Sequence, residues 1–325
     1  MSMTNTFGAT SATSATSTVS TTHQAAAHTE HDALSALSAP PVRATGLRVD
    51  YKGQPGVLAG LDWTLEPGQV VGLLGRNGAG KTTLLETLLG LREPQAGEVR
   101  LFGQPALTPD DALRARLGYV PQHAALFEEF NVGDLLRYFR SFYPRWNDAK
   151  VDGLMSRWDI PRDRRIAALS QGQQQRLSIV RALAHEPDLL VLDEPVASLD
   201  PAGRRDFLRE LVDQVLDRGT TVVFSTHILS DLERVAFNLA FLSQGRIALQ
   251  APQDALSEEV RLLAGAAAAL DAAVAAHGGQ VLRRRESGGQ QRWLVRFQGE
   301  TMPANDAIVR CERLSLEDLF LELTQ

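Results

Sequence analysis

The sequence is poor in cysteine, lysine and aromatic residues, and it has no long hydrophobic run. The one cysteine, Cys311, excludes an internal disulfide and fits a reducing compartment such as the cytosol. No stretch approaches the ~20 consecutive apolar residues of a membrane-spanning helix, so a role at a membrane would need a partner protein. The formal net charge of −6 provides no basic footprint for nucleic acid. The 325 residues, of which 44% are hydrophobic, suffice for one large domain and an appendage.

Residues 1 to about 40 consist largely of Ala, Ser and Thr and contain neither Lys nor Arg. This composition predicts a disordered tail, and it argues against a secretory signal and against an arginine-rich transit peptide. His23, His28 and His31 lie in this segment at irregular spacing, so we expect solvated histidines there and no metal site.

Lysine occurs at only three positions, 52, 81 and 150, and Lys81 lies in a glycine-rich segment. Residues 75–83 read Gly-Arg-Asn-Gly-Ala-Gly-Lys-Thr-Thr, between the apolar run 70–74 and the helical pattern 84–89. This order is typical of a phosphate-binding loop, in which glycines bring backbone N–H groups close to phosphate and a helix N-terminus attracts negative charge. We expect Lys81 between the β- and γ-phosphates and the Thr82 hydroxyl on Mg²⁺. The expected phosphate-loop contacts are Gly75, Arg76, Asn77, Gly78, Ala79, Gly80, Lys81, Thr82 and Thr83.

Two further apolar runs end in polar residues that fit the same site. The first, 189–193, ends at Asp193 and is followed by Glu194. We expect Asp193 to act on Mg²⁺ through a coordinated water molecule. We expect Glu194 to be the general base for the water that attacks the γ-phosphate. The second, 221–226, is β-branched and ends at His227, which could hydrogen-bond the γ-phosphate and hold Glu194 and water in line. The alternatives are a solvated acidic loop and a structural histidine.

Six motifs in a fixed order carry a family resemblance. They are Gly75–Thr83, Val120-Pro121-Gln122, Leu169-Ser170-Gln171-Gly172-Gln173, Leu192-Asp193-Glu194-Pro195, Ser198-Leu199-Asp200 and Ser225-Thr226-His227. In this order the sequence resembles the ATP-binding cassette family over roughly residues 41–250. The resemblance implies an α/β P-loop NTPase fold with a mostly parallel sheet and a helical subdomain inserted at about 123–180. A small α+β accessory module would follow at 251–325.

The resemblance also implies roles for residues outside the phosphate loop. Tyr51 would stack on adenine, although it could instead cap a strand. Gln122 would contact Mg²⁺ or water and sense a membrane partner. The segment with Ser170, Gly172 and Gln173 would contact the γ-phosphate held by a second cassette, and Asp200 would communicate across that dimer. Catalysis would thus rest on Glu194, His227, Gln122 and Lys81, and the metal on Thr82, Gln122 and Asp193. The family more often has glycine where this chain has Gln171.

Nine aromatic residues lie from Tyr119 to Trp158, and all but Tyr119 follow Gln122. They are Tyr119, Phe127, Phe130, Tyr138, Phe139, Phe142, Tyr143, Trp146 and Trp158. Packing of the helical subdomain would account for some of them, and the rest could form a socket for a short helix of a membrane subunit.

After residue 250 we expect an Ala- and Leu-rich helix over 254–277 that stops at Gly278-Gly279. A hairpin of 280–285 and 291–297 around the turn 286–290 follows, and then a final helix from Ser315 with Leu316, Leu319, Phe320 and Leu323 on one side.

The function expected from these observations is that of an ATP-hydrolysing subunit of a bacterial exporter. Its partners would be a polytopic membrane permease and a second cassette, identical or related, with no nucleic acid. It would lie in the cytoplasm at the inner face of the membrane, held there by the permease. Two alternatives stay open: a soluble cassette ATPase acting on chromosomes or ribosomes, and a non-hydrolysing regulatory module, which Gln171 would suggest.

Overall fold

The computed structural model describes residues 39–197, 199–227, 238–287, 290–299, 302–305 and 308–324. Residues 40–325 form one compact unit. The expectations for the tail with its three histidines, for Ser198 and for the Gly288-Gly289 turn lie outside the described residues.

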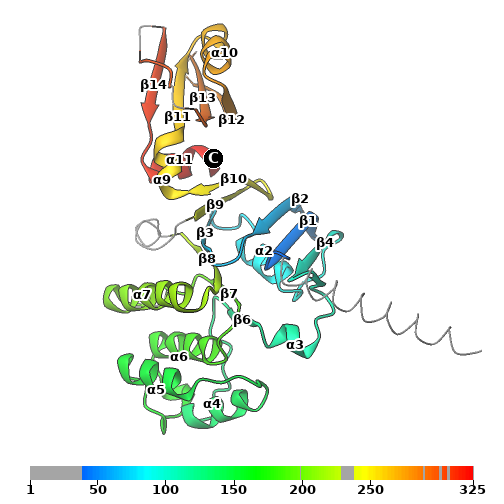
Figure 1. The fold of residues 1–325 in the computed structure, drawn as a ribbon, viewed down its shortest axis with the longest axis vertical. Coiled ribbons are helices and arrows are strands. Elements are labelled where there is room, and N and C mark those ends of the chain that lie inside the picture. Colours follow the sequence, from blue (N-terminus) through cyan, green and yellow to red (C-terminus); the bar gives the residue numbers. More distant parts are fainter. Residues whose placement is uncertain are drawn as a thin grey trace, which may run out of the picture. The chain divides into compact units, whose positions relative to one another are not determined.

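A six-stranded sheet lies at the centre of the fold, in the order β10-β9-β3-β8-β7-β6 (Figure 1). Its strands are β3 (Val70–Leu74), β6 (Leu117–Val120), β7 (Leu189–Asp193), β8 (Thr221–Thr226), β9 (Asn238–Ser243) and β10 (Arg246–Pro252). All neighbours pair in parallel except β10, which is antiparallel to β9. β3, β7 and β8 are buried along their whole length, because a parallel sheet is covered on both faces. The predicted α/β fold with a mostly parallel sheet is confirmed.

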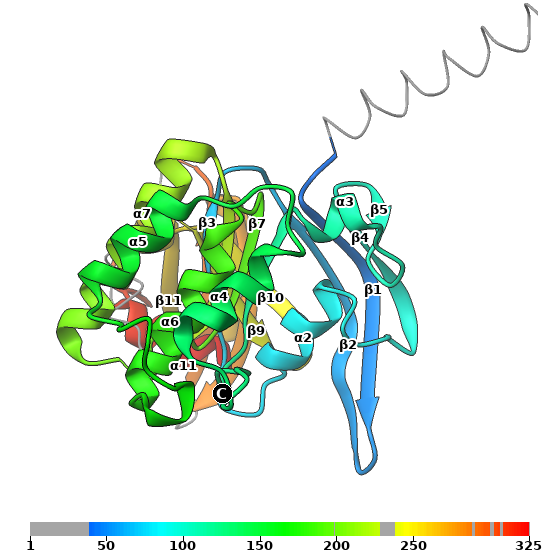
Figure 2. The ribbon, with the colours of Figure 1, turned by 90° about the horizontal axis from the view of Figure 1, so that it is seen from below.

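A second, antiparallel sheet has the order β2-β1-β4-β5. It consists of β1 (Val42–Tyr51), β2 (Gln54–Leu65), β4 (Ala96–Leu101) and β5 (Gln104–Pro105). Helix α2 (Lys81–Leu88) lies between the two sheets (Figure 2). Its Leu84, Leu85 and Leu88 pack into a core that contains residues of both sheets. The helix that begins at the phosphate loop is therefore fixed by apolar contacts on both sides.

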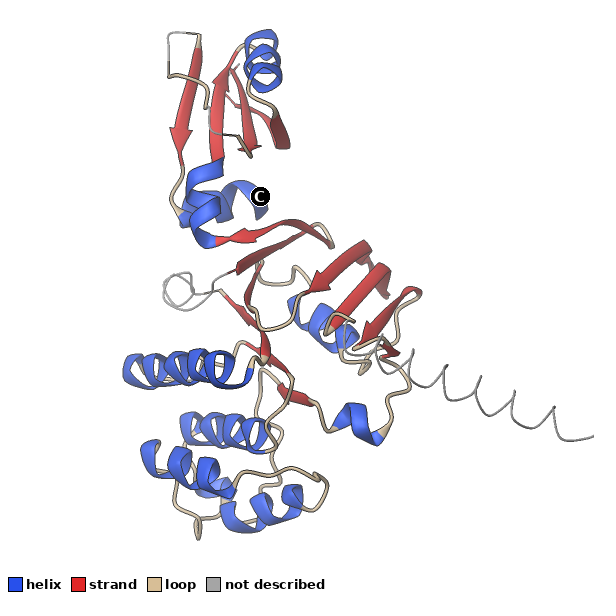
Figure 3. Ribbon diagram, in the orientation of Figure 1, coloured by secondary structure: helices blue, strands red, loops and turns tan. Residues whose placement is uncertain are grey.

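The helices after β5 include those of the expected helical insertion (Figure 3). They are α3 (Asp111–Arg114), α4 (Val132–Arg140), α5 (Asp148–Arg157), the short 3-10 helix η1 (Ile166–Ala168), α6 (Gln171–Ala184) and α7 (Pro201–Arg218). α6 begins at Gln171, within the Ser170–Gln173 motif. Its N-cap Ser170 and its third residue Gln173 form a reciprocal capping box, which satisfies backbone donors of the first turn.

The chain continues after β10 with a four-stranded sheet, ordered β12-β13-β11-β14, and three helices. These elements are α9 (Gln253–Glu259), β11 (Val260–Gly265), α10 (Ala267–Ala276), β12 (Gly279–Ser287), β13 (Gln290–Phe297), β14 (Val309–Arg313) and α11 (Leu316–Thr324). The hairpin of β12 and β13 is confirmed, and so are the final helix and the helix stop at Gly278, whose φ is +62°.

The single helix expected over 254–277 is wrong, because β11 divides it. β11 lies between β13 and β14 and pairs with both, so its backbone groups find partners in the sheet. Val260, Leu262 and Leu263 are buried on it. Tertiary pairing here outweighs the helical preference of an Ala- and Leu-rich segment.

Helix α11 contacts β9 of the central sheet. Its Leu319 and Leu323 belong to the same apolar core as Phe241 of β9 and Leu294 of β13. The boundary expected at residue 250 stays a prediction, although α9 to α11 and β11 to β14 follow it as an α+β segment. Among the helices of the described ranges, none combines the length and the apolar character needed to cross a bilayer.

Candidate functional site

A hollow of about 500 Å³ lies over the phosphate loop, a volume within the usual range of small-molecule sites. The residues that line it are Tyr51, Gln54, Val57, Asn77, Gly78, Gly80, Lys81, Thr82, Thr83, Gln122 and Glu194. The structure thus brings together predicted residues from four separate parts of the chain. Gln54 and Val57 were missed, because only the return of β2 past the loop places them here.

Two glycines of the loop are required for different reasons. Gly80 has φ +97°, and a Cβ at this position would lie 2.9 Å from Cγ1 of Val57. Gly75 is not in a left-handed conformation; a Cβ there would lie 3.0 Å from the carbonyl oxygen of Leu242. Gly75 is therefore favoured by its close packing on β9 and not by its backbone conformation. The loop is tied internally, since Ala79 N–H donates to the Arg76 carbonyl at 3.0 Å.

Lys81 and Glu194 line the hollow, and His227 contacts Glu194. Lys81 Nζ lies 3.5 Å from Glu194 Oε1 and donates to the Gly75 carbonyl at 3.0 Å. His227 Nδ1 lies 2.9 Å from Glu194 Oε2. The Lys81 and Glu194 side chains are only 6% and 12% exposed, so water screens this ion pair weakly. Glu194 lies directly after β7 and His227 directly after β8, as the two apolar runs predicted.

Asp193 lies below the hollow and is fully buried. The Thr82 hydroxyl donates to its Oδ2 at 2.6 Å, and the Ser225 hydroxyl donates to its Oδ1 at 2.5 Å. Ser225 was predicted only as a member of the Ser225-Thr226-His227 motif, without a role of its own. The contact follows from the parallel register of β7 and β8, which places Asp193 opposite Ser225.

Tyr51 ends β1 at the rim of the hollow and is partly exposed. Its hydroxyl lies 3.0 Å from Oγ1 of Thr83, and the Arg92 guanidinium lies 5.0 Å from the centre of its ring. Arg92 is itself held by two hydrogen bonds to Glu86. The ring is thus tethered beside the loop with one face against a cation, and adenine stacking on it stays a prediction.

The remaining predicted residues lie at two other helix starts. Ser170, Gly172 and Gln173 begin α6, and Asp200 immediately precedes α7. Asp200 Oδ1 accepts from Gly203 N–H at 2.6 Å and lies 3.5 Å from an Arg176 nitrogen on α6. The two helix starts are therefore joined by a side-chain contact.

The aromatic residues after Gln122 divide into buried and exposed ones. Trp158 is buried in the main core. Tyr143 stacks on His185 with ring centres 4.0 Å apart, and burial raises the pKa of Tyr143 while it lowers the pKa of His185 to about 4. Five other rings contact one another, and three of these are substantially exposed: Phe127, Tyr138 and Phe142. We call these three the aromatic patch.

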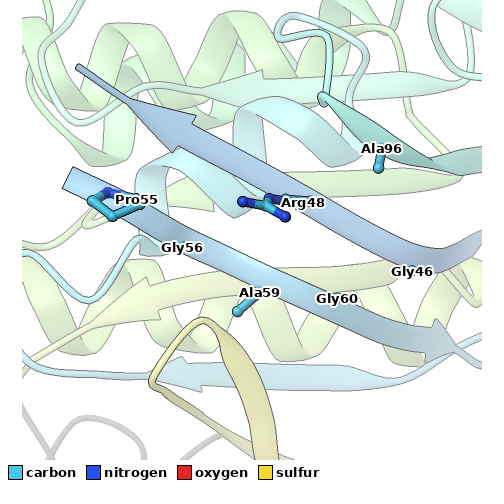
Figure 4. A pocket seen from close by; sticks show the side chains of 7 residues that line it. All are labelled: Gly46, Arg48, Pro55, Gly56, Ala59, Gly60 and Ala96. Carbon is cyan, nitrogen blue, oxygen red and sulfur yellow. The ribbon is translucent and has the colours of Figure 1, made fainter. Parts of the chain in front are cut away.

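A second hollow of about 510 Å³ lies on β1 and β2 (Figure 4). Its lining residues are Gly46, Arg48, Pro55, Gly56, Ala59, Gly60 and Ala96. Arg48 is the only ionisable residue of this lining, and its Nε is paired with Asp50 at 2.9 Å. Although the two hollows have similar volumes, the chemical groups are concentrated in the one over the phosphate loop.

Comparison with known proteins gives the same result as the geometry. Residues 58–197 match the family model described as ABC transporter. The "Nod factor export ATP-binding protein I" of Paraburkholderia xenovorans is 38% identical over 214 residues, which are 64% of this chain and 70% of that protein. The protein of the same name from Burkholderia orbicola is 36% identical over 230 residues, which are 69% of this chain and 75% of that one.

Two solved structures extend the likeness to three dimensions. An ATP-binding subunit of an ABC transporter has a TM-score of 0.61 at 28% identity, covering 67% of this chain and 92% of that chain. A bacterial Atm1-family ABC exporter with ATP bound has a TM-score of 0.59 at 28% identity, covering 68% of this chain and 40% of that chain. With its phosphate loop, its paired acidic residues and these relatives, the chain belongs to the ABC transporter family, as one of its ATP-binding ATPase subunits.

Proposed function

We propose that this ATPase subunit drives an exporter, and that Glu194 is the base of the hydrolytic step. The observation that carries the proposal is the placement of the Glu194 carboxylate at the wall of the hollow, between Lys81 and His227. The charges there suggest a simple exchange. A γ-phosphate that binds Lys81 removes the partner of Glu194, and the carboxylate is then free to accept a proton from water.

Mg²⁺ fits the oxygens beneath the hollow. The Thr82 hydroxyl and the Asp193 carboxylate meet at the start of α2, and Mg²⁺ prefers hard oxygen ligands together with phosphate and water. In the proposed site Thr82 holds the ion directly, while Asp193, and Gln122 at the rim, hold it directly or through water. When bound, Mg²⁺ offsets charge on the phosphate oxygens.

The other residues of the hollow position the reactants. Backbone N–H groups of residues 75–83 and the N-terminus of α2 hold the phosphates, and Lys81 places an ammonium between them. Glu194 takes a proton from the attacking water, and His227 holds the carboxylate in line with the γ-phosphate. Tyr51 supports the adenine ring at the rim.

A second cassette completes the proposed site. The first turn of α6, with Ser170, Gly172 and Gln173, presents free backbone donors to the γ-phosphate of the partner cassette. Asp200 is well placed for communication between the two sites, because it contacts both α7 and Arg176 of α6. Binding of ATP would close the dimer, and hydrolysis would reopen it.

The membrane partner is proposed to bind at the aromatic patch. Phe127, Tyr138 and Phe142 expose rings close to Gln122 in the sequence, and exposed aromatic clusters mark interfaces. A short helix of a polytopic permease would fill this socket and hold the subunit at the inner face of the membrane. The direction of transport is inferred from relatives whose names describe export.

The test is affinity purification of an E194Q variant from detergent-solubilised cells with ATP and Mg²⁺, with co-purifying proteins identified by mass spectrometry. Stoichiometric recovery of a polytopic membrane protein is the expected result. Recovery of ribosomal or chromosomal proteins without a membrane partner would replace the exporter by a soluble ATPase.

A second substitution tests the socket. In the E194Q background, Phe142→Glu places a charge on a ring that is 61% exposed, so it should release the permease and leave folding intact. The same change at Tyr143 is unsuitable, because that ring stacks on the buried His185. A Phe142→Glu variant that still recovers the permease would contradict the socket.

A further inference from the structure

We infer that Ser225 is a positioning residue that sets the geometry of both acidic residues in the proposed active site. The inference rests on the proposed function, because it treats Glu194 as the base and Asp193 as the residue on the metal side. Ser225 is the fifth residue of β8 and is fully buried, and β7 places Asp193 directly opposite it.

The Ser225 hydroxyl is both a hydrogen-bond donor and a hydrogen-bond acceptor. It donates to Asp193 Oδ1 at 2.5 Å, and it accepts the backbone N–H of Glu194 at 2.8 Å. Thr82 donates to the other oxygen of Asp193 at 2.6 Å. Each oxygen of the buried carboxylate therefore has its own hydroxyl donor, and the plane of the carboxylate is fixed by bonds at both ends.

The second bond acts on the backbone of Glu194. This residue has φ +46°, a left-handed conformation that a residue with a side chain rarely adopts. The turn takes the chain out of the sheet at the end of β7, and the Ser225 hydroxyl accepts the N–H that this turn leaves outside the strand ladder. Strain at an active site persists where neighbouring groups fix the conformation, and Ser225 does so here.

The conformation of this one residue decides where its carboxylate lies. From this left-handed backbone conformation the Glu194 side chain contacts both Lys81 and His227. An Ala residue at position 225 would leave the Glu194 N–H without its acceptor and Asp193 Oδ1 without its donor. Nucleotide affinity depends mainly on the loop, so the loss should fall on the chemical step and on the metal requirement.

The experiment compares S225A and S225C with a matched control, S178A, and with E194Q. The cysteine variant keeps the packing and supplies only a weak hydrogen-bonding group. Ser178 on α6 is also fully buried, and its hydroxyl has no hydrogen-bond partner. Steady-state kcat and KM for ATP, the Mg²⁺ concentration for half-maximal activity, and the thermal unfolding midpoint are measured for each.

We expect S225A and S225C to lower kcat by about 10- to 100-fold, the range found when groups that orient site ligands are removed. KM for ATP should change by less than about twofold, since the transition state and not the ground state is affected. The Mg²⁺ requirement should rise, and S178A should match the wild type in all four measurements. If S225A does not fold, S225C decides by the same criteria.

Two results would overturn the inference. One is a wild-type kcat in a folded Ser225 variant beside an inactive E194Q. The other is a parallel loss of kcat, ATP affinity and unfolding midpoint, which would show a merely structural role. Full activity of E194Q is a different outcome, because it removes Glu194 as the base and so contradicts the proposed mechanism itself.

Discussion

Acid should destabilise this protein through one buried histidine, His185 at the C-terminal end of α6. The ring is 1% exposed, stacks on Tyr143 and donates from Nε2 to the Leu117 carbonyl at 2.9 Å. Burial, with smaller contributions from the cations Arg145 and Arg181, lowers its pKa from 6.5 to about 4. The folded protein therefore keeps a neutral imidazole at a pH where the unfolded chain already binds a proton.

The sign and size of the effect follow from this difference. Between pH 6.5 and about 4 the unfolded chain binds more protons, so the free energy of unfolding falls as the pH falls, and the loss is complete below about pH 4. The gap between the two pKa values corresponds to ~3 kcal/mol at full effect. Between pH 7.5 and pH 5 the loss from His185 alone should be roughly 2 kcal/mol.

The assay is urea unfolding of the wild type and of His185→Gln at pH 7.5 and pH 5. The glutamine amide can donate to the Leu117 carbonyl and does not titrate, so it removes the contribution of His185 and leaves that of the carboxylates. We expect the wild type to lose ~2 kcal/mol more than the variant over this interval. Equal losses in the two proteins would refute the reasoning.

Two further substitution pairs test the fold and the site. Gly90→Ala should lower the free energy of unfolding by about 2 kcal/mol or more, because its φ is +69° and a Cβ would lie 1.9 Å from the Ala106 carbonyl oxygen. Gly153→Ala in α5, with open space around it, should instead raise the free energy of unfolding by ~0.5–1 kcal/mol. Similar unfolding midpoints for the two variants would contradict both predictions. Tyr51→Ala should weaken ATP binding by about threefold to tenfold, because adenine loses one stacking partner. Tyr51→Phe loses only the hydrogen bond to Thr83 and should bind ATP nearly as tightly as the wild type. Calorimetry that gives unchanged ATP affinity for Tyr51→Ala would exclude adenine stacking.

Local patterns predicted the elements that carry the nucleotide site. The apolar runs ending at Leu74, Asp193 and Thr226 became β3, β7 and β8, because a strand buried on both faces is mostly apolar. Their carboxyl ends lie along one edge of the parallel sheet, so the residues that follow them were expected together. Glu194 and His227 do meet there, 2.9 Å apart.

The contacts that could not be predicted join residues far apart in sequence. The packing of Val57 on Gly80 and the approach of Leu242 to Gly75 depend on how β2 and β9 are placed. The bond from Ser225 to Asp193 depends on strand register, and one residue of slip would turn its side chain to the other face. The prediction of one helix over 254–277 was wrong for the same reason, because β11 is stabilised by two neighbouring strands and not by its own composition.

The packing of α11 on β9 sets an order of events during protein synthesis. The ribosome makes β3, β7 and β8 long before residues 316–324, yet Leu319 and Leu323 fill the same core as Val70 and Phe224. Until α11 emerges, the nascent chain exposes apolar surface beside the strand that leads into the phosphate loop, and such surface is what chaperones bind. A nascent chain that stops before α11 therefore lacks two of the side chains that fill this core.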